Sequence, residues 1–77
     1  MSKVERIENL VLSAISERWS KAAMVAARAM SEDPSIDDRS IQRCLRTLGE
    51  RGLIEIAGDI SDLRSSEVRR TSKESDV

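Results

Sequence analysis

The stretch Arg39–Gly58, RSIQRCLRTLGERGLIEIAG, decides the fold because its hydrophobic period changes part-way along. Its first part carries one apolar stripe at the i, i+3, i+4, i+7 spacing of a helix, formed by Ile41, Cys44, Leu45 and Leu48. After Gly52 comes Leu53–Ala57, a short run rich in branched apolar residues that Gly58 closes, as in a strand. Gly52 suits the left-handed conformation that ends many helices. We therefore predict a helix to about Arg51 and a strand immediately after it.

Two further helices are predicted upstream of this stretch. The first covers residues 4–17, with Val4, Ile7 and Val11 on one face and a capping box between Ser2 and Glu5. The second is alanine-rich and covers residues 20–30, with Ser20 as its N-cap. Trp19 is expected to fill the corner between them. Pro34 separates the second helix from the third, which should begin at residues 35–38.

Downstream, Glu67–Thr71 is predicted as a second strand with Val68 pointing inward. The intervening Gly58–Ser66 would form a wing, with Ile60 and Leu63 folded back on the core. Three helices followed by a two-stranded hairpin predict a mostly α, α+β fold of the winged-helix type. In the proteins of this fold that bind DNA, the third helix makes the contacts with the bases. We expect one domain over residues 1–71 and a flexible polar tail over residues 72–77.

The composition argues against several classes of chemistry. The chain has no histidine, and Cys44 is its only cysteine, so a zinc site and a histidine-activated nucleophile are not expected. Its glycines form no phosphate-binding loop. One tryptophan with no phenylalanine or tyrosine makes no base-stacking platform. We therefore expect no catalytic site, no cofactor, no metal and no small-molecule substrate. Without a signal peptide or an apolar membrane span in the sequence, a cytoplasmic location is expected, with no membrane partner.

The hairpin region resembles a bacterial family of domains of unknown function. The matching runs are Leu45–Leu48, Arg51–Glu55, Gly58–Ile60 and Leu63–Arg69, and Trp19 with the alanine-rich segment after it is similar too. The similarity spans most of residues 4–70, and its most specific part is the stretch from Gly58–Asp59 to Arg69. The resemblance implies a winged-helix-like fold. It implies no activity, because the family has no established one and usually forms the C-terminal part of longer proteins.

The third predicted helix carries the sharpest functional pattern. Outside its apolar stripe stand Arg39, Gln42, Arg43 and Arg46. Arginine suits phosphates and guanine edges, and glutamine suits adenine. In the wing and the second strand, Arg64 and Arg70 could reach the DNA backbone. A solvated charged face on an amphipathic helix explains the same pattern without a ligand.

Carboxylates interleave with the basic residues of the hairpin. We therefore predict a structural clasp, made by mutual pairing of Asp59, Arg64, Glu67 and Arg69. The formal net charge of −1 also differs from the basic character that is usual for DNA-binding domains. Two classes of partner stay open at this point: double-stranded DNA bound by the third helix, or a protein partner, including a second copy of this chain in a homodimer.

Overall fold

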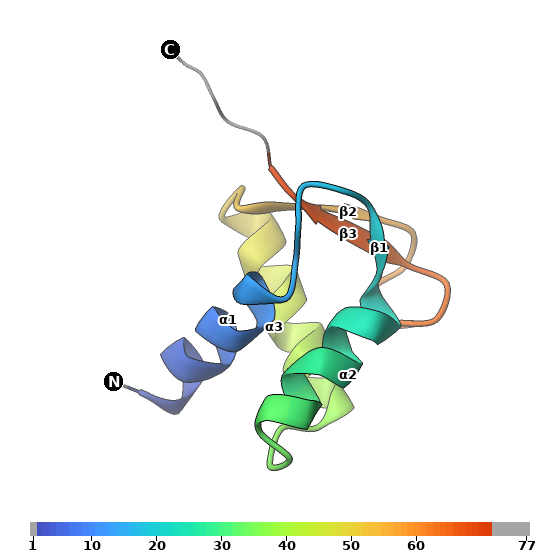
Figure 1. The fold of residues 1–77 in the computed structure, drawn as a ribbon. Coiled ribbons are helices and arrows are strands. Elements are labelled where there is room, and N and C mark those ends of the chain that lie inside the picture. Colours follow the sequence, from blue (N-terminus) through green and yellow to red (C-terminus); the bar gives the residue numbers. More distant parts are fainter. Residues whose placement is uncertain (1, 72–77) are drawn as a thin grey trace.

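The computed structural model describes residues 2–71, which form three helices and a three-stranded antiparallel sheet (Figure 1). In chain order the elements are α1 (Lys3–Ser13), β1 (Ser20–Lys21), α2 (Ala22–Glu32), α3 (Asp38–Glu50), β2 (Ile54–Ala57) and β3 (Glu67–Arg70). The mostly α, α+β class is therefore confirmed. The predicted tail over residues 72–77 lies outside the described residues.

The helix ends largely follow local sequence signals. Ser2 and Glu5 form the predicted capping box at the start of α1. The Asp37 carboxylate accepts the Ser40 backbone N–H at 2.9 Å and so caps α3. Gly52 has a φ of 78° just after α3, which is the left-handed conformation predicted for it. One end differs: α1 stops at Ser13 rather than residue 17, because the chain turns there toward the sheet.

The start of α2 departs from the prediction in a way that positions the β2–β3 loop (residues 58–66). The N-cap is Lys21, without a side-chain cap, and Ser20 lies in β1 instead. Carbonyls of the loop take over the capping role. Ala22 N donates to Ser66 O at 3.0 Å, and Ala23 N donates to Leu63 O at 3.1 Å. The loop is thereby fastened to the first turn of α2, whose N–H groups would otherwise lack partners.

The sheet has the order β1–β3–β2, so the predicted two-stranded hairpin is in fact the larger part of a three-stranded sheet. In β3, Val68 lies opposite Ser20 of β1 and Ile56 of β2. β1 was not predicted because two residues are too short to show a period-2 pattern, and their partner strand lies far along the chain.

The core lies between the three helices and one face of the sheet, which crosses one end of the helices (Figure 1). Ile60 and Leu63 are buried, which confirms that the loop folds back on the core, and Val68 is buried as predicted. The prediction for Trp19 was wrong: its side chain is 43% exposed, and the Arg69 guanidinium lies 4.7 Å from the ring centroid. Among residues 2–71, no helix has the length and apolar character needed to cross a membrane.

Candidate nucleic-acid interface

The outward face of α3 carries three exposed arginines, Arg39, Arg43 and Arg46, which we call the α3 stripe. At 3.6 residues per turn they lie within about 60° of one another, and the buried apolar residues lie on the opposite side of the helix. They span about 10 Å along the axis at 1.5 Å per residue. The two ion pairs found within residues 2–71 use other arginines, Arg51 and Arg69. Within the described part of the chain, no guanidinium group of the α3 stripe therefore forms an ion pair.

Gln42 lies beside this stripe but is held within the domain. Its side-chain Nε2 donates to Ser61 O at 3.2 Å, and the residue is half-buried. This hydrogen bond ties α3 to the β2–β3 loop. The predicted contact of Gln42 with a base edge would therefore require its amide nitrogen to leave an existing partner.

Arg70 was predicted to contact the DNA backbone, but its side chain is directed into the fold. The guanidinium donates from Nε to Ile15 O and from Nη2 to Leu12 O, both at 2.7 Å. Its backbone N donates to Ser16 O, also at 2.7 Å. A cation at the carboxyl end of a helix satisfies carbonyls that have no partner inside the helix and complements the helix dipole. Arg70 is thus a cap for the end of α1 rather than a free phosphate ligand.

The predicted clasp among the hairpin residues does not form as a unit. Asp59 accepts hydrogen bonds from the backbone and hydroxyl of Ser61 instead. Arg69 pairs with Glu55, directly across the strands, with Nη2 and Oε1 2.8 Å apart. The observed pair differs from the predicted clasp because the strand register places Glu55 directly opposite Arg69. Hydrophobic periodicity does not predict that register.

The other two members of the predicted clasp also remain apart. Within residues 2–71, Arg64 and Glu67 enter no ion pair. Arg64 is exposed in the β2–β3 loop, whereas Glu67 is half-buried in β3. Arg64 is therefore still available for the phosphate contact predicted for the wing.

Carboxylates border the α3 stripe at both ends. Hydrogen bonds from the Ser40 backbone and side chain lower the pKa of Asp37. The pKa of Asp59 is lowered by hydrogen bonds from Ser61 and, more weakly, by the charge of Arg46. Glu50, one turn after Arg46, continues the stripe with a negative charge, and its i+4 spacing could have been noticed in the sequence.

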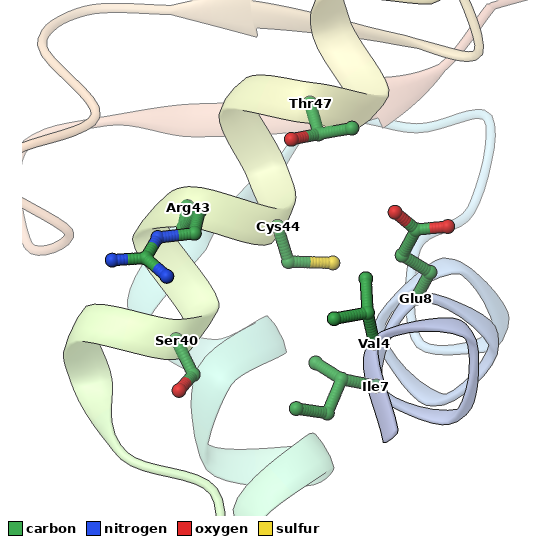
Figure 2. Close-up of a pocket in the computed structure, with 7 residues that line it drawn as sticks. All are labelled: Val4, Ile7, Glu8, Ser40, Arg43, Cys44 and Thr47. Atoms are coloured by element: carbon green, nitrogen blue, oxygen red, sulfur yellow. The ribbon is translucent and has the colours of Figure 1, made fainter. Parts of the chain in front are cut away.

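A small pocket of about 120 Å³ lies between α1 and α3, and Arg43 is one of the residues that line it (Figure 2). Val4, Ile7 and Cys44 supply its apolar wall, with Glu8 above them. Burial, with a smaller contribution from the charge of Glu8, raises the pKa of the Cys44 thiol to about 11. The thiol is therefore protonated at neutral pH and serves as an apolar surface. No cluster of three or more His, Cys, Asp or Glu residues suited to a metal ion occurs within residues 2–71.

No family model, curated protein or solved structure matches the chain. The resemblance to a family of domains of unknown function stays a prediction from the hairpin residues.

Proposed function

We propose that the chain is a non-enzymatic, winged-helix-like domain of the cytoplasm that binds double-stranded DNA through α3, in the manner of a transcriptional regulator. The observation that carries this proposal is the α3 stripe: Arg39, Arg43 and Arg46, exposed, aligned and free of ion-pair partners within residues 2–71. The order of helix, short strand, two helices and two strands supports the winged-helix part of the proposal, with α3 in the position of a recognition helix.

The dimensions of the stripe suit a major groove. A helix of about 10–12 Å in diameter fits the major groove of B-DNA, which is about 12 Å wide. Along the helix axis, the three arginines extend over about 10 Å. Guanidinium groups donate to guanine O6 and N7 and to phosphate oxygens, so one helix face can supply both kinds of contact. Arg64, exposed in the β2–β3 loop, is the remaining predicted contact that has no ion-pair partner within residues 2–71.

The surrounding charges predict modest affinity. The net charge is −1, and Glu50 and Asp59 flank Arg46. Few phosphates can be neutralised by such a surface, so binding should be strongest at low salt and weaken as salt rises, with a shallow slope. A second copy or another chain would be needed to reach the interface size that is typical of specific DNA complexes.

Fluorescence anisotropy with a labelled random-sequence duplex at low salt tests the proposal. The double variant Arg43→Ala, Arg46→Ala should bind at least about tenfold more weakly, since each lost arginine contact costs about 1–3 kcal/mol. The matched control is Arg18→Ala, Arg28→Ala, which removes the same charge from exposed positions outside α3. Equal binding by the two double variants, or no saturable binding by the parent chain, would overturn the proposal.

Protein binding is a second candidate, and one observation favours it. Val4 lies on the same helical stripe as Ile7 and Val11, which are buried, yet its side chain is 64% exposed at the rim of the α1–α3 pocket. An apolar residue in that position suits contact with another protein. This second function would be preferred if a protein partner bound the Arg43→Ala, Arg46→Ala variant normally but did not bind the Val4→Ser variant.

A further inference from the structure

The outer edge of β2 presents unpaired backbone groups, and the direction of these groups follows from one hydrogen bond. Thr71 N donates to Leu53 O at 3.1 Å, so the carbonyl of residue 53 points toward β3. This direction alternates along an antiparallel strand. Glu55 and Ala57 therefore also pair with β3, while the N–H and C=O groups of Ile54 and Ile56 point away from it. β2 is the last strand of the sheet, so these groups lie on an open edge.

Beneath this edge runs an open, mostly apolar groove of about 330 Å³ between β2 and the second half of α3. Ile54, Ile56 and Ile60 line it, while Arg46 and Glu50 stand on its α3 side. Exposed edges with apolar residues are sites at which another strand adds to a sheet, unless charges or prolines block them. The only charged side chain of β2 itself, Glu55, is held by Arg69 of the neighbouring strand.

The charges beside the groove are self-complementary, which means that they can pair with the same charges of a second copy of the chain. Arg46 and Glu50 are one helical turn apart and of opposite sign. Along the groove α3 runs against β2, because Gly49 lies at Ile56 whereas Arg46 acts on Asp59. A two-fold axis perpendicular to the sheet reverses this direction, which sets Arg46 of one copy toward Glu50 of the other. Such an axis is the usual symmetry of a homodimer, in which the same patch serves both subunits.

The strand register can be derived on the same basis. Residues that are directly opposite in an antiparallel pair share a face, and like charges there are unfavourable, which excludes Glu55 opposite Glu55 of the other copy. Pairing Ile56 with Ile56 of the other copy avoids this clash, because Glu55 then faces Ala57. It also uses the open N–H and C=O groups of Ile54 and Ile56.

We propose that two copies of this chain associate through the edge of β2, forming one continuous antiparallel sheet across both copies, with Arg46–Glu50 contacts across the dimer axis. The inference goes beyond DNA binding and does not depend on it. Arg46 belongs to both surfaces, so DNA and the second copy would compete for this side chain. Arg39 and Arg43 lie outside the β2 groove, which keeps the two proposals separable.

Charge reversal tests this dimer with an internal rescue. The parent chain should show concentration-dependent dimerisation in analytical ultracentrifugation between about 10 µM and about 1 mM. Arg46→Glu and Glu50→Arg should each weaken dimerisation at least about tenfold, because both symmetry-related contacts become repulsive.

Mixing the two charge-reversal variants in equal amounts should restore association as a heterodimer. The new carboxylate at position 46 of the first variant then faces the new guanidinium at position 50 of the second. The native Glu50 of the first variant likewise faces the native Arg46 of the second, so both contacts are again attractive. Rescue by mixing also shows that both variants are folded.

Arg43→Glu is the matched control, since it makes the same charge change on α3 outside the groove, and it should dimerise like the parent chain. Hydrogen exchange gives the strand-specific readout: amides of Ile54 and Ile56 should slow as concentration rises, whereas those of Glu55 and Ala57 should be protected throughout. A parent chain that stays monomeric at about 1 mM, or a mixture that fails to associate, would overturn the dimer. The DNA proposal would be unaffected, because the anisotropy assay with the Arg43→Ala, Arg46→Ala variant is made at low protein concentration, where the chain is monomeric.

Discussion

The arginines of β3 and those of the α3 stripe behave as two different sets. On β3, Arg69 binds Glu55 and lies over the Trp19 ring, and Arg70 binds two carbonyls at the end of α1. On α3, the three arginines of the stripe have no ion-pair partner within residues 2–71. Arg69 and Arg70 of β3 stabilise the fold, whereas the α3 arginines are available for a ligand. Counting basic residues in the sequence treats the two sets alike, and the structure separates them.

Arg70 should give the largest change in stability. Arg70→Met keeps the apolar stem but removes two charged hydrogen bonds to Leu12 O and Ile15 O. The expected loss is about 2–3 kcal/mol in the free energy of unfolding, since hydrogen bonds to charged groups contribute about 1.5–3 kcal/mol each and this side chain is only half-buried. Urea denaturation measures it. Arg18→Met, at an exposed loop position, is the control, and equal midpoints for the two variants would contradict the capping role.

Arg69 should have an intermediate effect. Arg69→Ala removes the pair with Glu55 and the contact with Trp19, which together contribute about 1 kcal/mol at a partly exposed site. A double-mutant cycle with Glu55→Gln isolates the pair, and a coupling energy of about 0.5 kcal/mol is expected. Strictly additive effects of the two substitutions would show that the cross-strand pair contributes nothing measurable.

The α3 arginines should matter least for stability. Arg39→Ala with Arg43→Ala should shift the free energy of unfolding by no more than about 0.5 kcal/mol, because exposed side chains without partners rarely contribute more. The same urea titration measures it. A loss comparable to that of Arg70→Met would mean that these side chains also serve the fold, and the contrast between the two sets would disappear.

Low pH should lower the stability of the fold by protonating carboxylates that border α3. The pKa of Asp37 is lowered below its ordinary value of 3.8 in the folded chain by hydrogen bonds from Ser40. A carboxyl group whose pKa is lower in the folded state stabilises the fold at pH values above its ordinary pKa. This contribution is lost as the pH falls through the folded-state pKa. Stability should therefore decrease below about pH 4. Asp37→Asn, which keeps a capping oxygen, should flatten this decrease in acid titrations followed by circular dichroism, and an unchanged slope would contradict the assignment.

The sequence predicted the elements that local signals specify. The Ile41–Leu48 stripe, Gly52 and the capping box of Ser2 and Glu5 predicted the ends of two helices, and the change of period after Gly52 placed the hairpin. β1 was missed because it exists only through its pairing with β3. The start of α2 was misplaced for a related reason, since backbone groups of the β2–β3 loop cap it instead of Ser20.

Side-chain partners on the candidate site were less predictable than the fold. Arg70 reaches carbonyls in and just after α1 that lie more than half the chain away in sequence, and Gln42 reaches Ser61 in the loop. Such partners depend on where α1 ends and where the loop folds back, which periodicity does not encode. The outward orientation of the α3 stripe was predicted from helical spacing. Residues on the side of a helix opposite its buried apolar residues face outward, and the helical period alone identifies them.

An NMR titration of the isotope-labelled chain with a random-sequence duplex at low salt tests the central claim most directly. The account predicts that the largest amide shift changes fall on residues 39–46 of α3, grow to saturation, and shrink as salt is raised. Changes confined to the α1–α3 pocket around Val4 and Cys44, or no changes at saturating duplex, would contradict DNA binding through α3.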